Sequence, residues 1–289
     1  MSLEVTVERA KRIDSHQHFW RYNPQELPWI ERGMSVLQRD FLPSELETLR
    51  RGAEIDASVA VQARTRPEET DWLLALARDN PSVAGVVGWA DFTAPDFSMR
   101  LEGWAEDPGF CGLRPVLQAM PDPAAVMADA TFNEGMERLQ RQGKSFDLLL
   151  KSHQLSGSAQ FCARHDAHWI IVDHCAKPAI PEGEWWTWHD NLARLAALPH
   201  VVCKLSGLVT EADWKNWRGQ NLLRYARAVI ELFGPARVLF GSDWPVCTLA
   251  AEYQEVVSLA AEAMAAYSAP ERAAMFGGNA AKVYNLKLL

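Results

Sequence analysis

Two histidines separated by one residue, His16 and His18, lie near the start of the chain, at the end of a segment predicted to be a strand. On an extended strand, residues i and i+2 point to the same face with Cα atoms about 6–7 Å apart, so both imidazoles can reach one ion. Imidazole nitrogen is a common ligand for zinc and for other transition metals. This short pattern alone is weak evidence for a metal site, because buried histidines also occur without one.

Three more residues whose side chains can bind a metal follow apolar segments later in the chain: His153, His174 and Asp243. If these segments are parallel strands of one barrel, their C-terminal ends lie together, and that end carries the active site in such folds. Independent core histidines would not fall at strand ends so consistently. The five residues together therefore predict one divalent metal site.

This set of residues favours hydrolysis. Two or three histidines and one carboxylate hold a metal and leave a position for water, which is typical of a catalytic site. The metal would lower the pKa of water toward about 7 and polarise a carbonyl group. Asp243 could bind the metal and also take the proton of water, while His174 could be a further ligand or contact the substrate carbonyl oxygen. An ester, lactone or amide would suit this chemistry, and no G-x-S-x-G motif supports a serine hydrolase.

The elements that must position these residues alternate between short apolar segments and longer segments of helical periodicity. This alternation predicts an α/β fold, a single (β/α)8 TIM-type barrel, with an open doubly wound sheet as second choice. No G-x-G-x-x-G motif follows the first segment, which weakens a dinucleotide-binding fold. We expect one domain over residues 1–289, with the barrel proper over about 11–286 and helices at 270–276 and 279–284 closing its bottom. The expected strands are 12–16, 57–62, 84–90, 112–116, 147–151, 169–173, 201–205 and 238–241.

Composition excludes several other classes of protein. The formal net charge of the 289 residues is −8, and no dense Lys/Arg run offsets it, which argues against nucleic-acid binding. No stretch of about 18 apolar residues predicts a membrane span, and the charged N-terminus does not resemble a secretory signal. Five cysteines without a C-x-x-C pair indicate buried thiols rather than a disulfide framework. We therefore expect a cytoplasmic protein whose partner is a small molecule.

Several motifs resemble one known family. The sequence is similar to the amidohydrolase superfamily, and within it to a branch of metal-dependent hydrolases that includes sugar lactonases. The resemblance covers about residue 11 to the C-terminus, and its motifs occur in barrel order. They are IDSHQHFW at 13–20, LPWI at 27–30, GLR at 112–114, VDHCAKP at 172–178, CKLSG at 203–207 and GSDWP at 241–245.

The resemblance implies a mononuclear site with ligands His16, His18, His153 and Asp243, and with His174 facing the substrate. Dinuclear relatives carry a bridging carboxylated lysine where this chain has Arg114, so a two-metal centre is not expected. The implied cofactor is one divalent ion, zinc first and manganese second. Some members of the branch do without a metal, so metal independence stays open.

Other strand-end residues are candidates for the substrate pocket. Gln62 and Trp89 end the second and third segments, and Arg114 ends the fourth. Arg114 could donate hydrogen bonds to the lactone oxygens or form a structural ion pair. Trp29 and Trp244 could stack on the apolar face of a sugar, although core packing is the alternative for both.

The functional hypothesis is hydrolysis of a sugar-acid lactone, such as L-fuconolactone or a related aldonolactone, to the free acid. Asp243 would be the general base, and His174 and Arg114 would stabilise the tetrahedral oxyanion. A first alternative is a lactone that bears a carboxylate, of the muconolactone or pyrone-dicarboxylate type, or a metal-dependent decarboxylation; Arg64, Arg66, Arg114 and Lys204 would supply its cations. A second is a barrel that binds a ligand without catalysis.

Overall fold

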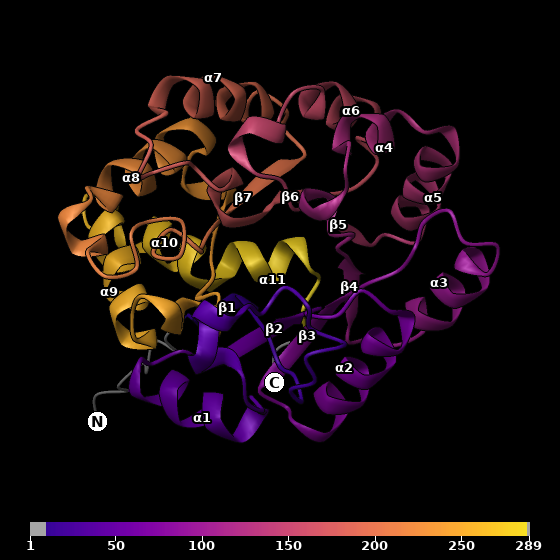
Figure 1. The fold of residues 1–289 in the computed structure, drawn as a ribbon, viewed down its shortest axis with the longest axis horizontal. Helices are drawn as coiled ribbons and strands as arrows, with labels where there is room; N and C mark the ends of the chain where they lie inside the picture. The colour runs from indigo at the N-terminus through magenta and orange to yellow at the C-terminus, as the bar shows by residue number, and fades with distance from the viewer. Residues whose placement is uncertain (1–9, 288–289) are drawn as a thin grey trace, which may run out of the picture.

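The computed structural model describes residues 10–287 and contains one sheet of eight parallel strands in sequential order, β1 to β8. The strands form a ring at the centre of the molecule (Figure 1). Most of their residues are buried on both faces, which explains the continuous apolar runs in the sequence. The strands are β1 Ile13–Gln17, β2 Ala57–Val61, β3 Val83–Gly88, β4 Phe110–Leu113, β5 Ser145–Leu148, β6 Ile170–Val172, β7 Val201–Leu205 and β8 Val238–Phe240.

The ring closes between the first and last strands. Gln17 forms a parallel bridge with Trp244, just beyond β8. The amide of Asp243 donates to the carbonyl of His16 at 2.8 Å, and the amide of His18 donates to the carbonyl of Trp244 at 2.7 Å. The predicted (β/α)8 barrel is confirmed, and the closing seam carries four of the predicted site residues, His16, His18, Asp243 and Trp244.

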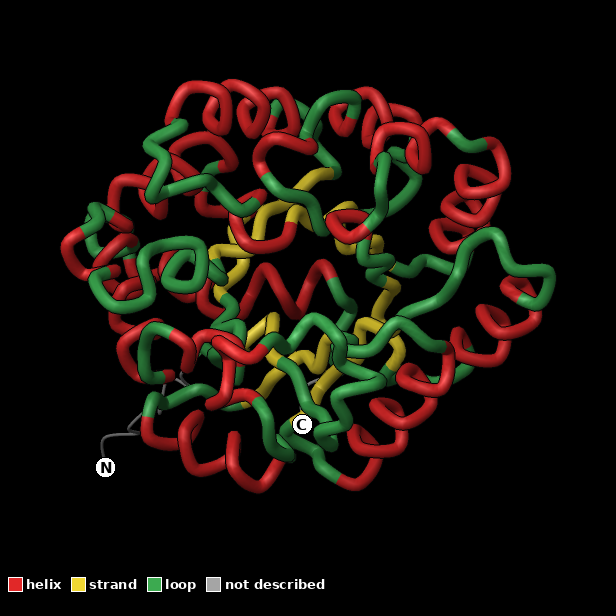
Figure 2. Tube along the Cα trace, in the orientation of Figure 1, coloured by secondary structure: helices red, strands yellow, loops and turns green. Residues whose placement is uncertain are grey.

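Helices surround the strands and cover their outer faces (Figures 1 and 2). α8 shows how the sequence specifies one of them. The Asn221 side chain caps its first turn by accepting from the amide of Arg224 at 3.2 Å, and Gly234, at φ 72°, ends it. The helices are α1 Pro43–Gly52, α2 Pro67–Asp79, α3 Phe97–Ala105, α4 Pro123–Ala128, α5 Ala130–Arg141, α6 Ser158–Arg164, α7 Trp185–Ala196, α8 Leu222–Phe233, α9 Tyr253–Ala263, α10 Ala269–Ala273 and α11 Asn279–Val283.

The last helix, α11, closes the N-terminal end of the barrel, as the sequence predicted. Figure 2 shows it crossing the opening of the ring of strands. Asn279 donates to the carbonyl of Val238, at the start of β8, at 2.7 Å. Gly277 lies so close to the first strand that a Cβ there would stand 2.1 Å from the carbonyl oxygen of Lys11. Tyr284 follows α11 and packs against the apolar residues that fill the lower barrel, among them Ile13 and Val202.

Strand boundaries differ from the prediction mainly in the fourth and fifth segments. β4 covers 110–113 and β5 covers 145–148, so both strands begin and end earlier than expected. Pro115 has no amide hydrogen for the ladder beyond β4. Leu149 and Leu150 are buried after β5 without extending the strand, which made this apolar run appear longer than the strand itself.

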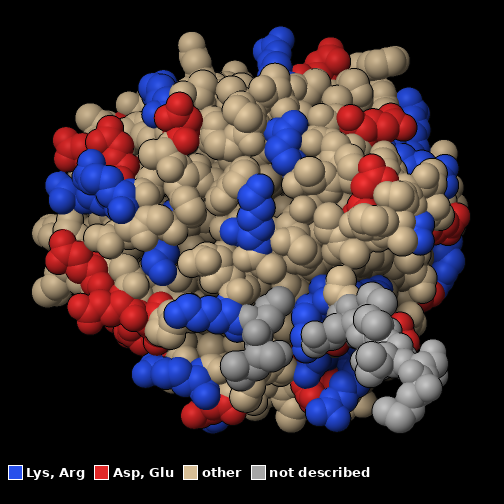
Figure 3. Space-filling view, turned by 180° about the vertical axis from the view of Figure 1, so that it is seen from behind, with Lys and Arg blue, Asp and Glu red and all other residues tan. Residues whose placement is uncertain are grey.

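The surface shows no segregation of charge on the face drawn in Figure 3, where acidic and basic side chains are interspersed. Among residues 10–287, no helix combines the length and the apolar character needed to cross a membrane.

Candidate active site

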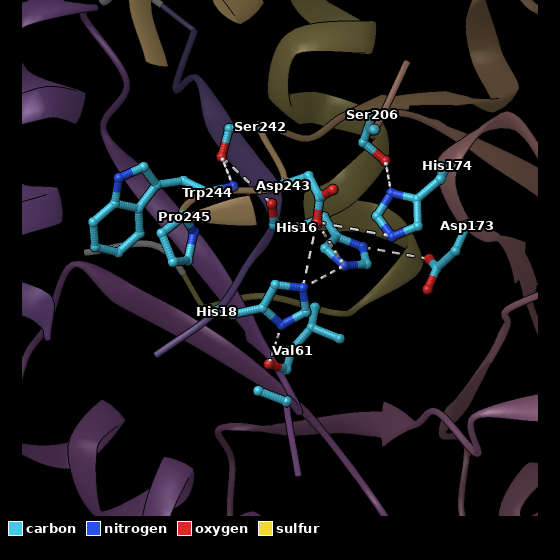
Figure 4. A network of polar contacts seen from close by, with 12 residues as sticks. His16, His18, Val61, Asp173, His174, Ser206, Ser242, Asp243, Trp244 and Pro245 are labelled. Atoms are coloured by element: carbon cyan, nitrogen blue, oxygen red, sulfur yellow. Dashed lines mark hydrogen bonds and ion pairs between the residues drawn. The ribbon is translucent and has the colours of Figure 1, made fainter. Parts of the chain in front are cut away.

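Four predicted site residues meet at the C-terminal end of the barrel: His16, His18, His174 and Asp243 (Figure 4). Asp243 Oδ1 lies 3.4 Å from His18 Nε2, 3.9 Å from His16 Nε2 and 3.9 Å from His174 Nε2. The two Nε2 atoms of His16 and His18 are 3.2 Å apart, so both rings face one point as their spacing predicted. All four residues are buried.

Asp14 fastens β1 to the loop that carries Asp243. Its carboxylate accepts from the amide of Ser242 at 2.8 Å, from the Ser242 hydroxyl at 2.5 Å and from the Tyr253 hydroxyl at 3.1 Å. Burial raises the pKa of Asp14 to about 6, while these hydrogen bonds act to lower it. The pairing of β1 with β2 shifts register between Asp14 and Gln17. This irregularity allows the side chain of Asp14 to point in a different direction from the histidines that follow.

The backbone fixes the tautomer of His18. His18 Nδ1 is 2.8 Å from the carbonyl oxygen of Val61, which can only accept, so Nδ1 carries the proton and donates it. The lone pair of Nε2 is therefore directed toward His16 and Asp243. A backbone partner of this kind is typical of histidines that bind metals.

His174 is held by an unusual stretch of backbone. Residues 174–177 have φ values between 46° and 58°, so four successive non-glycine residues are left-handed. Such conformations cost energy and are concentrated at functional sites. Ser206 Oγ lies 3.0 Å from His174 Nδ1, which leaves Nε2 directed toward Asp243. Burial lowers the pKa of His174 well below its ordinary value, although Asp243 acts to raise it, so the ring is neutral at pH 7.

Gly207 provides the space for the His174 ring. It has a φ of 68°, and a Cβ there would lie 2.7 Å from His174 Nδ1 and 2.8 Å from Cγ. We expect Gly207→Ala to displace the imidazole and to lower kcat at least about tenfold, with a loss of about 1–3 kcal/mol in unfolding free energy. Steady-state kinetics and urea denaturation would measure both effects. Gly143→Ala is a matched control, since Gly143 also has a positive φ (64°) but nothing within 4 Å of the added Cβ. Equal kinetics for the two variants would contradict this role of Gly207.

Beneath His16, the barrel interior contains a network of buried charges. Lys204 Nζ donates to Asp147 Oδ2 at 2.5 Å and lies 3.1 Å from both Asp173 Oδ1 and His16 Nδ1. Tyr284 donates its hydroxyl to the same Asp147 oxygen at 2.9 Å. Lys204, Asp147 and Asp173 have no exposed side-chain surface. His16 is thus supported from inside the barrel by a network that reaches to the residue following α11.

Arg114 belongs to this network as well as to the site. Its guanidinium lies 3.3 Å from Asp173 Oδ2 and 3.3 Å from His16 Nε2. It also donates to the carbonyl of Gln62 at 2.7 Å, and the Gln62 side chain donates to the carbonyl of Arg114 at 3.0 Å. The structural ion pair considered from the sequence is therefore present, and Arg114 still borders the histidines. The Oε1 atom of Gln62 is buried and has no partner among the described residues.

The structure does not bring His153 to the cluster. This residue is exposed, in the short helical turn Ser152–Gln154. Because β5 already ends at Leu148, the chain has left the barrel wall before it reaches His153. The prediction of His153 as a ligand is therefore not supported in this conformation, and His174 lies in the cluster instead.

Trp244 also lies elsewhere than predicted. Its side chain is 1 % exposed and packs edge-on against the rings of Phe19 and Phe41. Figure 4 shows its indole on the far side of Asp243 from His174. Core packing, the alternative considered for this residue, describes its position, and the ring is not accessible to a sugar.

Trp29 and Trp89 remain candidates for the substrate pocket. Trp29 is 37 % exposed, and its indole donates to the carbonyl of Ala63, just beyond β2, at 3.0 Å. Trp89 is half-buried and directly follows β3, where its amide donates to the Thr70 hydroxyl oxygen at 2.9 Å. Both residues lie beyond strand C-termini, on the side of the barrel that carries the cluster.

The donor set fits a divalent metal ion. Tetrahedral ligands at about 2.0–2.1 Å from an ion are about 3.3–3.4 Å from one another. The contacts of His18 with His16 and Asp243, at 3.2 and 3.4 Å, approach this spacing. His16, His18 and Asp243 form one of two groups able to hold an ion among the described residues; the other is His16, Asp173 and His174. We favour the first group, since Asp173 is already paired with two cations.

Sequence reasoning missed Asp147 and Tyr284 and did not assign Asp173 a role. A signal was present in two apolar strands that each contain one charge, Asp147 in β5 and Lys204 in β7. A charge in a strand buried on both faces requires a partner of opposite charge. This pairing could have been expected from the sequence, but its position beneath His16 could not.

Known proteins resemble this chain over nearly its whole length. Residues 13–286 match the model of the amidohydrolase family. The chain is 48 % identical to an L-fucono-1,5-lactonase of Burkholderia multivorans, over 96 % of this chain and 97 % of that one. It is 36 % identical to an L-fucono-1,5-lactonase of Burkholderia ambifaria, over 95 % and 96 %. A crystal structure of an amidohydrolase from Burkholderia multivorans with bound zinc superposes with a TM-score of 0.93, at 47 % identity, over 96 % of this chain and 100 % of that one. The chain belongs to the amidohydrolase family.

Proposed function

We propose that the protein hydrolyses a sugar-acid lactone, with L-fuconolactone and related aldonolactones as first candidates. The observation that carries the proposal is the convergence of three imidazole nitrogens, the Nε2 atoms of His16, His18 and His174, on one oxygen of Asp243. The relatives at 48 % and 36 % identity that bear the name L-fucono-1,5-lactonase support the choice of substrate.

Asp243 is the general base of the proposed reaction. Burial acts to raise its pKa, but His174, His18 and Lys177 lower it more, so the carboxylate is ionised at neutral pH. It accepts a proton as the oxygen of water bonds to the lactone carbonyl carbon. It then returns the proton to the ring oxygen as the bond between carbonyl carbon and ring oxygen breaks. The product is an open sugar acid with a free hydroxyl.

His174 and Arg114 stabilise the oxyanion that forms between these steps. If the Ser206 hydroxyl donates to His174 Nδ1, Nε2 carries the proton and is a donor toward the substrate. Arg114 presents its guanidinium on the side of His16. Donors fixed before the reaction are worth most in a buried site from which water is excluded.

We propose that His16, His18 and Asp243 hold one divalent ion, with zinc as first candidate. Such an ion supplies Lewis acidity, which lowers the pKa of water and polarises the carbonyl. His18 is prepared for this role by its bond to Val61, and His16 by Asp173, whose Oδ1 lies 3.4 Å from Nδ1.

The arrangement of cations disfavours a substrate with ring carboxylates. Arg64 is paired with Glu69 at 2.5 Å and with Glu26 at 2.8 Å, and Arg66 is paired with Glu26 at 2.7 Å. Lys204 and Arg114 are paired with buried aspartates beneath the site. The four cations considered for an acidic lactone or a decarboxylation therefore already have anionic partners.

A pH-indicator assay with a panel of aldonolactones tests the proposed substrate. We expect acid release with L-fucono-, L-galactono- or D-arabinono-lactone and none above background with carboxylate-bearing lactones. Hydrolysis of the acidic lactones alone would reverse the assignment, and no hydrolysis of either class would favour a non-catalytic barrel.

Removal of metal gives a separate prediction. After dialysis against a chelator, we expect turnover to fall at least about tenfold and to return when zinc or manganese is added. Metal content measured by atomic emission before and after dialysis is the control. A protein that contains no metal yet retains full turnover would contradict the proposed ion and leave the lactonase reaction to Asp243 and the histidines.

A further inference from the structure

An ion pair connects the two loops that enclose His174. Lys177 Nζ lies 2.9 Å from Glu211 Oε1, and the two side chains are 19 % and 22 % exposed. Lys177 is held to His174 by its amide, which donates to the carbonyl of His174 at 2.8 Å. The amide of Glu211 donates a hydrogen bond at 3.2 Å to the carbonyl of Gly207, the residue against the His174 ring. The pair therefore lies at the margin of the buried site, where His174 itself is 3 % exposed.

Lys177 differs from the other cations near the site in its access to solvent. Arg114 and Lys204 are 5 % and 0 % exposed, and both are paired with Asp173 inside the barrel. Lys177 nevertheless belongs to the wall of the site, because its amide donates to the carbonyl of His174 at 2.8 Å.

The chemistry of the reaction creates a need for such a cation. A neutral lactone and water give an acid that releases its carboxyl proton to solvent, so the negative charge of a carboxylate appears beside Asp243, which is itself an anion. The proposed divalent ion would offset the charge of Asp243 inside the site, and a second cation at the exposed margin would stabilise the product carboxylate as it leaves that ion. Lys177 can meet this need if its ammonium exchanges the carboxylate of Glu211 for that of the product, an exchange that conserves charge.

We infer that Lys177 binds the carboxylate of the sugar acid as it forms, and that Glu211 competes for this cation. The competition keeps the affinity for anions low, so that the acid leaves and neutral lactones are preferred to acidic ones. This inference rests on the proposed function. This partly exposed ion pair is a suitable exchange partner because ion pairs in contact with solvent contribute little to stability and break readily.

Two single substitutions separate this role from a structural one. Glu211→Gln keeps the shape and a hydrogen-bonding group but removes the competing charge, so we expect L-fuconate to bind at least about tenfold more tightly. Lys177→Met removes the cation, so we expect L-fuconate to bind at least about tenfold more weakly, and Lys177→Arg should restore most of the affinity. Titration calorimetry measures these constants without turnover, and inhibition of lactone hydrolysis by L-fuconate measures them during turnover.

The substrate preference gives a second readout. The ratio of kcat/KM for a carboxylate-bearing lactone to that for a neutral aldonolactone should rise in Glu211→Gln and fall in Lys177→Met. Glu137→Gln is the matched control, since Glu137 pairs with Arg141 on the exposed face of α5 at 3.6 Å. Glu137→Gln changes the net charge by the same amount as Glu211→Gln. It should leave the L-fuconate affinity and the ratio of kcat/KM values unchanged.

The inference requires that Glu211→Gln and Lys177→Met change the affinity for L-fuconate in opposite directions. If the pair only fastens the two loops, both substitutions disturb His174 in the same way and change L-fuconate affinity in the same direction, or not at all. Either result would overturn the role of Lys177. Failure of the proposed function is a different observation, the absence of lactone turnover by the unmodified protein.

Discussion

Asp243→Asn should lose nearly all turnover, by at least about 10³-fold in kcat, while the protein stays folded. General base catalysis contributes about 10²–10⁴-fold, and an amide neither accepts a proton at neutral pH nor carries the charge that offsets a divalent ion. The substitution is mild for the backbone. Asp243 has a φ of 59°, a conformation that asparagine adopts more readily than most residues.

Initial rates with an aldonolactone and thermal unfolding of the same preparations would test this expectation. Asp190→Asn is the control, because Asp190 is exposed and lies on α7, outside the cluster. Near-normal kcat in Asp243→Asn would remove Asp243 from the mechanism. A large fall in unfolding temperature together with lost activity would leave the role undecided, and the metal content of the variant would then separate a ligand from a base.

Lys204→Met should be strongly destabilising, by about 3–5 kcal/mol in unfolding free energy. The substitution leaves Asp147 and Asp173 in the barrel interior without their shared cation, and unpaired buried charges are costly. It also removes the ammonium 3.1 Å from His16 Nδ1, so kcat should fall as well. Urea denaturation followed by circular dichroism would give the change in stability.

The double variant Lys204→Met/Asp147→Asn is the informative comparison. If the loss comes from the uncompensated Asp147 carboxylate, neutralising this residue should recover a measurable part of the stability. If the stability losses of the single variants Lys204→Met and Asp147→Asn instead add up to the loss of the double variant, each side chain contributes through packing alone. Asp147 has a second partner in Tyr284, so recovery should remain partial.

The sequence was sufficient for the architecture because most strands are short apolar runs and they alternate with helices of clear periodicity. α8 begins at Leu222 and ends at Phe233, bounds that are visible in the sequence because a capping asparagine precedes the helix and a glycine follows it. The spacing of His16 and His18 was enough to place both rings on one face, because the geometry of an extended strand fixes it.

What could not be predicted depends on distances along the chain after a strand ends. His153 follows an apolar run that extends beyond β5, and hydrophobicity alone does not distinguish the buried turn residues Leu149 and Leu150 from strand residues. Trp244 follows Asp243 directly, yet the backbone turns its ring into the aromatic core around Phe41. The direction of a side chain after a left-handed residue is a property of the tertiary structure, and sequence periodicity carries no information about it.

The seam between β1 and β8 has a consequence for the order of synthesis. The hydrogen bonds from Ser242 to Asp14 join residues 228 positions apart, and Asp243 reaches the two histidines only across this seam. A nascent chain that has emerged only as far as β7 therefore holds His16, His18 and His174 but lacks the carboxylate on which they converge. With Asp243 in the proposed role of general base, catalytic capacity would be acquired in one late step, when the last strand closes the ring.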